Sequence, residues 1–226
     1  MSVVSSLTVR SARAGDALDL HALHQTIYAE ARWFVGDGAP SADAITRRLR
    51  SLDPRHSCYV VALIHNPIIH NQGQGHLPSQ NHLPSQNHIP SQIQSQGHMQ
   101  DQQQQLSGWL ELNRPQPQRL RHVAVLTIAV APAWRRRGVA RQLLTRGYQW
   151  AQQKGVKKIQ LDVRAGNTAA IALYEREGFV LEGRERAQIL TPQGYEDNLV
   201  MAKFLDERVL HTDAPLTNHT ATDNHV

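Results

Sequence analysis

Apolar residues recur with two different periods along the chain, and each period predicts one type of element. Alternating or β-branched runs predict strands at 7–10, 58–64, 106–113, 122–130, 157–163, 179–189 and 196–205. Apolar positions at helical spacing predict helices at 15–29, 41–52, 137–154 and 168–177. This order predicts an α/β fold (mixed α+β) in which helices cover both faces of one central sheet.

Residues 66–105 interrupt this pattern. The hexapeptides GHLPSQ, NHLPSQ and NHIPSQ follow one another from Gly75 to Gln92, and each contains a proline. Such a polar tract buries too little apolar area to offset the entropy lost on ordering it. We therefore predict one domain over 1–205 that is interrupted by a disordered insertion at 66–105, and a largely disordered tail at 206–226.

Histidines in this insertion raise the question of a metal. Structural zinc sites use closely spaced ligands, commonly with cysteine. The insertion offers only histidines, mostly six residues apart in the repeat: His70, His76, His82, His88 and His98. A weak zinc, nickel or copper site is the alternative, but the spacing predicts no metal site.

Charge is distributed unevenly along the chain, whose formal net charge is +5. Between Leu112 and Leu161 there are arginines and lysines but no aspartate or glutamate. Such a block indicates a negatively charged partner, namely a phosphate-bearing cofactor, a nucleic acid or an anionic surface. Cys58 is the only cysteine, which fits a reducing, cytoplasmic location. No run approaches the roughly 18 apolar residues of a membrane-spanning helix.

The stretch APAWRRRGVARQLL, residues 131–144, lies where a predicted strand gives way to a helix. Pro132 ends strand pairing because it has no N–H to donate. The helix that follows begins with N–H groups that lack partners within it, at the positive end of its dipole. Gly138 permits close approach to the backbone and Ala140 keeps the next position small. Together with the arginines, these features predict a pyrophosphate site. The P-loop and dinucleotide-binding strings are absent.

A second stretch, GNTAAIALYEREGF at 166–179, follows the next predicted strand. Asn167 occupies the N-cap position of a short helix, and its amide can also contact a ligand. Gly178 is placed to end that helix. Tyr174 lies near the end of the helix, either as a core residue or as a side chain that contacts a ligand.

The two stretches together resemble the GNAT superfamily of acetyl-CoA-dependent N-acyltransferases. Arg135 to Ala140 match its Arg/Gln-x-x-Gly-x-Gly/Ala signature, NTAAIALYEREGF resembles its second motif, and GYEDNLVMAKFL resembles its last strand. The resemblance covers about 7–205 without the insertion, and it is similar to the bacterial branch that acts on amino acids and other small amines. It implies a twisted, mostly antiparallel sheet of six or seven strands.

The resemblance also implies roles for residues, with acetyl-CoA as the acyl donor. Backbone groups of Ile128 and Val130, at a splayed or bulged strand, would hold the pantetheine arm and the thioester carbonyl. Asn167 would contact the cofactor near its pantetheine, and Tyr174 would protonate the departing thiolate. The pyrophosphate would lie against the segment made of Arg135, Arg136, Arg137, Gly138, Val139, Ala140 and Arg141.

The resemblance does not identify the residue that acts as the general base. Members of this branch often carry a glutamate in the fourth strand, where this chain has Val125. Glu30 and Asp197 are candidate catalytic bases because their segments flank the acceptor cleft in the family, and His122 is a further candidate. Each carboxylate could instead be structural or solvated, and an acceptor that arrives neutral would need no base.

We therefore predict an N-acetyltransferase in which a primary amine, of a small molecule or a free amino acid, attacks acetyl-CoA directly in a ternary complex. A protein N-terminal α-amine acetyltransferase of the ribosomal-protein type and a non-catalytic acyl-CoA sensor are the alternatives. The sequence favours nucleic-acid binding less, because no aromatic-rich signature accompanies the basic residues between Leu112 and Leu161. We expect neither a membrane nor a nucleic-acid partner, and a homodimer is left open.

Overall fold

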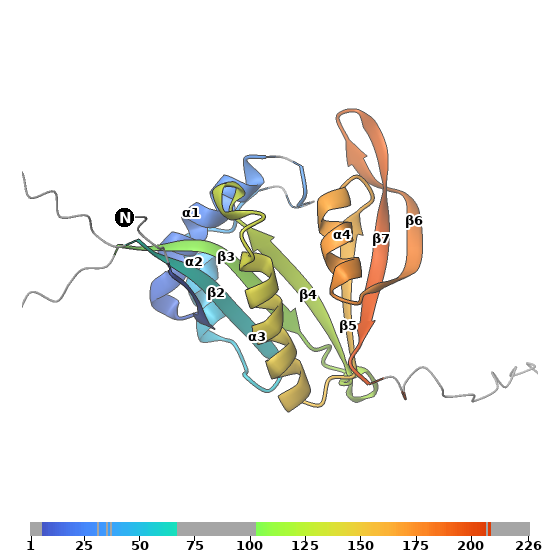
Figure 1. The fold of residues 1–226 in the computed structure, drawn as a ribbon, viewed down its shortest axis with the longest axis horizontal. Helices are drawn as coiled ribbons and strands as arrows, with labels where there is room; N and C mark the ends of the chain where they lie inside the picture. Colours follow the sequence, from blue (N-terminus) through green and yellow to red (C-terminus); the bar gives the residue numbers. More distant parts are fainter. Residues whose placement is uncertain are drawn as a thin grey trace, which may run out of the picture.

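The computed structural model describes residues 6–30, 32–34, 36, 38–66, 103–206 and 208. Its strands form a single sheet of seven, in the order β1-β2-β3-β4-β5-β7-β6 (Figure 1). Only β4 and β5 pair in parallel, and all other neighbours are antiparallel. The strands are β1 (Ser6–Ser11), β2 (Ser57–Asn66), β3 (Gln103–Asn113), β4 (Val123–Val130), β5 (Lys158–Arg164), β6 (Val180–Thr191) and β7 (Gly194–Phe204). The predicted mixed fold with a mostly antiparallel sheet is confirmed.

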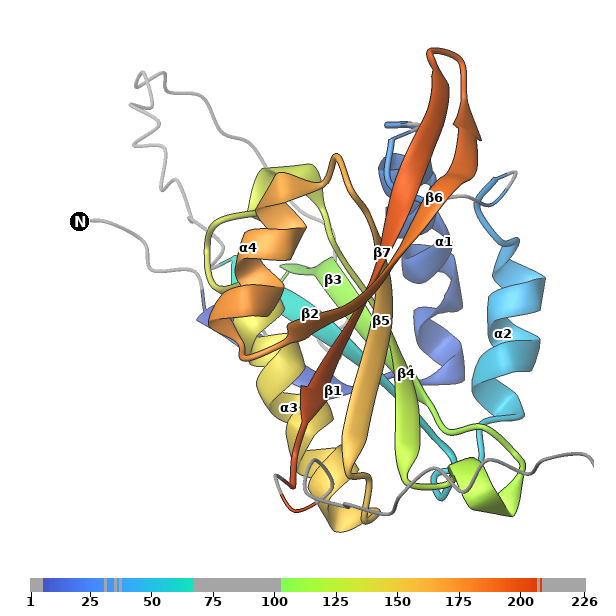
Figure 2. The same cartoon turned by 90° about the vertical axis from the view of Figure 1, so that its right-hand side faces the viewer.

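Helices cover both faces of the sheet, as the sequence predicts. Figure 2 shows α3 and α4 on one side and α1 and α2 on the other. The helices are α1 (Ala17–Tyr28), α2 (Ala42–Arg50), α3 (Val139–Gln153) and α4 (Thr168–Arg176). Short 3-10 turns lie at Ala14–Asp16, Gln118–Leu120 and Pro132–Trp134. None of the helices in the described ranges has the length and apolar character that a bilayer crossing requires.

The sheet separates two apolar cores. Along β2, Val60 and Ala62 pack in the core under α3 and α4, whereas Tyr59, Val61 and Leu63 pack in the core under α1 and α2. Neighbouring residues of a strand face opposite sides of its sheet, so a strand covered on both faces is apolar throughout. This explains why β2 has a continuous apolar run rather than an alternating one.

The parallel pair β4 and β5 separates soon after it forms. Only Val123–Val125 pair with Lys158–Gln160. Beyond these residues β4 continues along β3 to Val130, while β5 continues along β7 to Arg164. The sheet is therefore open between the second halves of β4 and β5, which is the splay that the family resemblance implies.

The structure corrects the bounds of the predicted insertion and tail. The ladder between β2 and β3 continues to the pair Asn66 and Gln103, so these residues belong to strands. Residues 67–102, with the five histidines, lie outside the described residues, and their predicted disorder stays a prediction. Asp206 belongs to the folded domain, because its carboxylate lies 2.8 Å from Lys157 Nζ. Residues 209–226 lie outside the described residues.

Candidate active site

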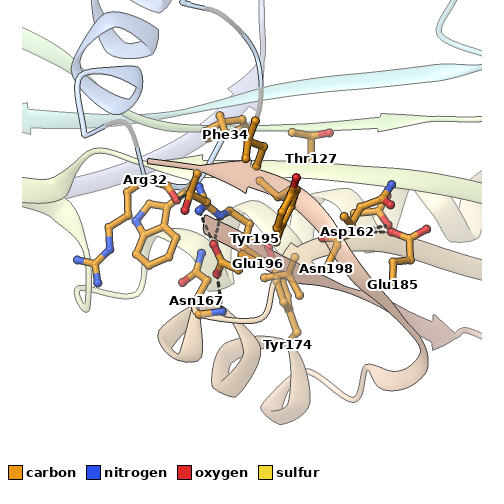
Figure 3. Close-up of a pocket in the computed structure, with 18 of the residues that line it drawn as sticks. Arg32, Phe34, Thr127, Asp162, Asn167, Tyr174, Glu185, Tyr195, Glu196 and Asn198 are labelled. Carbon is orange, nitrogen blue, oxygen red and sulfur yellow. Dashed lines mark hydrogen bonds and ion pairs between the residues drawn. The ribbon is translucent and has the colours of Figure 1, made fainter. Parts of the chain in front are cut away.

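A cavity of about 1150 Å³ lies over the opening between β4 and β5 (Figure 3). Asp162 lines it from β5, between Leu161 and Val163, whose side chains belong to the core under α3 and α4. Asp162 therefore faces the opposite side of the sheet. Tyr174 comes from α4, packs in that same core and also lines the cavity. The cavity thus connects the two faces of the sheet.

Backbone groups of β4 face this opening. Ala131 N donates to Ser107 O on the β3 side at 2.9 Å, and Lys158 N on the β5 side donates to His122 O at 3.1 Å. Backbone N–H and C=O groups alternate in direction along a strand, so those of the even-numbered residues of β4 point toward β5. Ile128 and Val130 therefore direct their N–H and C=O groups into the opening, beyond the last residue pair of the β4–β5 ladder. These are the two positions that the resemblance assigns to the pantetheine arm.

The loop after β4 turns through two left-handed residues, Arg136 at φ 60° and Gly138 at φ 81°. Gly138 is the N-cap of α3, and Gln142 N donates to its carbonyl at 3.2 Å. The earlier N–H groups of the helix, from Val139 to Arg141, therefore have no partner within it. Among the described residues, apart from the glycine and its two chain neighbours, no heavy atom lies within 4 Å of a Cβ built on Gly138. The glycine is required for its backbone angle, and the space beside it is open.

Arg135 is fixed by the protein rather than free for a ligand. Its Nη2 lies 2.9 Å from Glu30 Oε2, and its Nε donates to Val130 O at 3.1 Å. Glu30, predicted as a candidate base, does not line the cavity. Its carboxylate instead neutralises Arg135 and ties the end of α1 to the loop after β4.

The other arginines of the segment have separate surroundings. Arg137 lies over the ring of Trp134, 5.1 Å from its centroid, which is a cation–π contact. Arg141 Nε lies 3.8 Å from Glu177 Oε1. Arg136 is exposed in the left-handed turn. The segment is therefore a shaped loop with local contacts rather than a uniform cationic surface.

Asn167 and Tyr174 take the positions that the second motif predicts. Asn167 is the N-cap of α4, its Oδ1 accepts from Ala170 N at 3.2 Å, and it lines the cavity. Tyr174 is 8% exposed, and its ring centroid lies 5.5 Å from that of Phe179. Burial raises the pKa of the Tyr174 phenol to about 12, so the phenol keeps its proton and can donate it. Gly178, at φ 84°, follows the end of α4 as predicted.

The sequence reasoning missed a cluster of two carboxylates and an amide in the cavity. Asn198 Nδ2, from β7, donates to Glu185 Oε2 on β6 at 2.8 Å and to Asp162 Oδ1 on β5 at 3.3 Å (Figure 3). Asn198 is only 8% exposed, so the amide is held in place within the wall. One signal was available, since Asp162 is an acid between Leu161 and Val163 in an apolar strand, just before the second motif.

A third acidic residue of the wall, Glu196, is structural. Arg164 Nε donates to its Oε2 at 2.8 Å and Gly166 N donates to its Oε1 at 2.9 Å. Partial burial opposes ionisation, but these hydrogen bonds outweigh it and hold the pKa of Glu196 below its usual value. A Cβ on Gly166 would lie 2.6 Å from Glu196 Oε1, so a larger residue there would have to displace the end of the Glu196 side chain.

The structure does not bring the other predicted bases into the cavity. Asp197 Oδ1 accepts from Ala187 N at 2.8 Å and its Oδ2 from Arg184 Nε at 2.6 Å. These bonds stabilise a bulge of β6 in which Ala187 has φ 52°, and they lower the pKa of Asp197. His122 is exposed at the start of β4, away from the opening. A role as base for Asp197 or His122 stays a prediction without geometric support.

Two further sequence interpretations concern Cys58 and Val125. Cys58 is buried, and burial raises the pKa of its thiol to about 11. It is a core residue outside the cavity. Val125 does line the cavity and is 37% exposed, so an apolar side chain stands where the branch often has a glutamate.

Part of the chain is similar to known proteins. Residues 79–179 match the family model described as "Acetyltransferase (GNAT) family". The chain is 42% identical over 83 residues to the [ribosomal protein bS18]-alanine N-acetyltransferase of Salmonella typhimurium, which is 37% of this chain and 56% of that relative. It is 33% identical over 100 residues to the L-amino acid N-acetyltransferase AaaT of Escherichia coli, covering 42% and 60% of the two chains. The matches thus span less than two thirds of the length of either relative.

The fold is similar to that of solved acetyltransferases. The phosphinothricin acetyltransferase of Sinorhizobium meliloti in complex with AcCoA superposes with a TM-score of 0.66, over 89% of both chains, at 17% sequence identity. At this identity the likeness concerns the fold alone.

Proposed function

We propose that this chain is an acetyltransferase of the GNAT family, which residues 79–179 resemble, and that it transfers the acetyl group of acetyl-CoA to a primary amine by direct attack in a ternary complex. The cavity through the opening between β4 and β5 carries this proposal. On one side β4 leads directly into the turn at Gly138 and the start of α3. On the other side lie Asp162 and Glu185, so donor and acceptor can meet from opposite faces.

The residues present fit acetyl-CoA, which would supply an acyl group activated as a thioester. Its pyrophosphate suits the open space beside Gly138 and the first N–H groups of α3, since a helix N-terminus favours an anion. Its pantetheine suits the backbone groups of Ile128 and the N–H of Val130, which face the opening, whereas the Val130 carbonyl already accepts from Arg135 Nε. Asn167 stands at the same side of the cavity, at the start of α4.

Proton transfer is assigned to two cavity residues. Asp162 accepts a proton from the attacking amine, held in position by Asn198. As the new C–N bond forms and the C–S bond breaks, the Tyr174 phenol donates a proton to the departing sulfur. A coenzyme A thiol is acidic enough that a weak acid suffices. Direct attack also fits Cys58, whose buried thiol lies outside the cavity.

We propose that the acceptor is the α-amine of an amino acid or of a polypeptide. The acidic groups Asp162 and Glu185 favour a cationic acceptor in the cavity. The two relatives point the same way, since one is named for the alanine of a ribosomal protein and the other for L-amino acids. The segment from Arg135 to Arg141 fits a cofactor better than a nucleic acid. Arg135 is paired with Glu30 and Arg137 lies over Trp134, so these two arginines do not form an open cationic surface for a phosphate backbone.

The experiment that tests this function measures free-thiol release from acetyl-CoA with a panel of amino acids and peptides. We expect at least one α-amine to be acetylated, and Asp162→Asn to lower kcat/KM at neutral pH by about 100-fold. Because Asp162 removes a proton that the amine loses by itself at high pH, the deficit should shrink toward pH 9–10. A deficit that is equally large at every pH would contradict the assignment of Asp162 as base. Absence of thiol release with every amine would contradict the function.

A further inference from the structure

The tip of the β6–β7 hairpin presents two large apolar side chains to solvent beside the cavity. Leu190 and Tyr195 are directly opposite each other in the β6–β7 ladder, and each is 75% exposed. Both line the cavity wall. A cross-strand pair puts its side chains on the same face, about 5 Å apart at Cβ, so the two form one apolar surface. Exposed apolar surface at the rim of a site indicates a binding partner.

The hairpin is built to hold this pair in one place. Thr191 Oγ1 donates to Gly194 O at 2.8 Å and accepts from Gln193 N at 3.2 Å, which fixes the turn. Lower down, Asp197 stabilises the bulge at Ala187. Bulges bend a strand and redirect its end. Figure 2 shows the hairpin extending past the sheet toward the segment that joins α1 and α2. The apolar pair is therefore a positioned surface rather than a loose loop end.

The cavity is acidic near Asn198 and apolar at the rim formed by Leu190 and Tyr195. Asp162 and Glu185 lie in the wall near Asn198, and they suit a cationic amine. The rim contributed by Leu190 and Tyr195 suits an apolar group instead. At about 1150 Å³, the cavity exceeds the roughly 300–1000 Å³ that holds a drug-sized ligand. The donor's pantetheine would take part of this space, and a free amino acid that places its amine near Asp162 would leave the rim without contact.

We propose that Leu190 and Tyr195 bind an apolar side chain that follows the acetylated α-amine, so that the acceptor is a polypeptide N-terminus with an apolar residue soon after its first residue. This inference rests on the proposed function, and it selects one of its two acceptor classes. One extended peptide can then place its α-amine beside Asp162 and Glu185 and an apolar side chain against the rim.

The test compares two peptides that begin with alanine and carry either leucine or serine at both the second and third positions. Free alanine serves as the third acceptor. Each is assayed with the wild-type chain, with the double variant Leu190→Ser/Tyr195→Ser, and with Leu18→Ser as the matched control. Leu18 is 74% exposed on α1 and does not line the cavity.

We expect the wild-type kcat/KM to be about 10-fold higher for the leucine peptide than for the serine peptide, as a hydrophobic contact in a binding pocket provides. The double variant should lose this preference, because kcat/KM for the leucine peptide falls toward that for the serine peptide, while acetyl-CoA affinity stays unchanged. Leu18→Ser should keep the preference. A wild-type chain without preference, or a double variant that retains it, would overturn the inference. Turnover of free alanine but of neither peptide would overturn it and leave the proposed function standing. Turnover of no amine would remove both.

Discussion

Tyr174 shows how one side chain acquires a chemical role from its position. The α4 helix inserts it into the core under α3 and α4, where its burial is nearly complete, yet it reaches the cavity wall. Burial raises its pKa to about 12. The phenol therefore stays protonated at every pH at which an enzyme of this kind works, and a protonated phenol is what a departing thiolate requires.

We predict that Tyr174→Phe lowers kcat by about 100-fold, within the range expected for loss of a general acid. Acetyl-CoA affinity should change little, because the ring keeps its packing against Phe179. Tyr148→Phe is the control, since Tyr148 lies on α3 and does not line the cavity. Steady-state kinetics and calorimetry check both variants. Because the Tyr174 phenol stays protonated, its ionisation should cause no loss of wild-type activity below about pH 10. Unchanged kcat in Tyr174→Phe would remove this residue as the acid.

At the same scale, the sequence identified some site residues and not others for a physical reason. Asn167 and Tyr174 lie in one contiguous motif, so their spacing alone places them on one short helix. Asp162, Glu185 and Asn198 come from three strands and meet only through the register of β5, β7 and β6. That register is set by long-range pairing, which local spacing does not encode.

At the scale of elements, the start of α1 depends on one buried carboxylate. Asp16 accepts from Arg10 Nη1 and Nη2, each at 2.7 Å, and from Arg13 N at 2.7 Å. Burial alone would raise the pKa of Asp16, but these hydrogen bonds outweigh burial and lower it. A folded-state pKa below the unfolded value means that the ionised carboxylate stabilises the fold, and that this contribution disappears as pH falls through the folded value.

We predict that Asp16→Asn lowers the free energy of unfolding by about 2 kcal/mol at pH 7, the cost of breaking a partly buried ion pair that is hydrogen-bonded. The difference from wild type should narrow as pH falls below about 4, where the Asp16 carboxyl of the unfolded chain begins to protonate, and should vanish once the folded carboxyl, with its lowered pKa, is protonated too. Asp19→Asn, at an exposed position of the same helix, should cost less than about 0.5 kcal/mol. Urea denaturation at several pH values measures all three. A pH-independent difference would contradict the role of the charge.

The periodicity of the sequence predicted the elements well, because most helices and strands bury a face. The helices α3 and α4 and the strand β4 begin and end close to their predicted residues. The extension of β3 back to Gln103 was missed, because a glutamine run has no apolar period. Those residues are strand because β2 pairs with them across the hairpin.

At the scale of the whole molecule, the pattern of periods does not specify the order of strands in the sheet. The strand β7 lies between β5 and β6, and β4 pairs with β5 in parallel for only a short length. The strand order and the short β4–β5 pairing decide where the sheet opens and hence where the cavity lies. The family resemblance implied the splay, whereas composition and period did not.

The corrected bounds of the insertion allow a sharper deletion. Asn66 and Gln103 are paired across the β2–β3 ladder, so their backbones are close enough for a two-residue turn to join them. We predict that replacing 67–102 by Asn-Gly leaves kcat/KM for the best acceptor within about 2-fold of wild type, because a loop insertion costs little to close. Thiol release and thermal unfolding measure the outcome. Loss of the folded state would show that 67–102 contributes to the domain.

The most direct test of the acetyl-CoA site at the start of α3 is a calorimetric titration of the wild-type chain, Gly138→Ala and Gly155→Ala with acetyl-CoA. The two glycines have positive φ, at 81° and 69°, and in the described part of the chain an added Cβ at either would have only its chain neighbours within 4 Å. They precede and follow the same helix, so both substitutions should cost about 1 kcal/mol of stability. We predict wild-type binding in the micromolar range, at least about 10-fold weaker binding by Gly138→Ala, and unchanged binding by Gly155→Ala. Equal affinity in all three proteins, or no binding by the wild type, would contradict the assignment of this helix start as the pyrophosphate site.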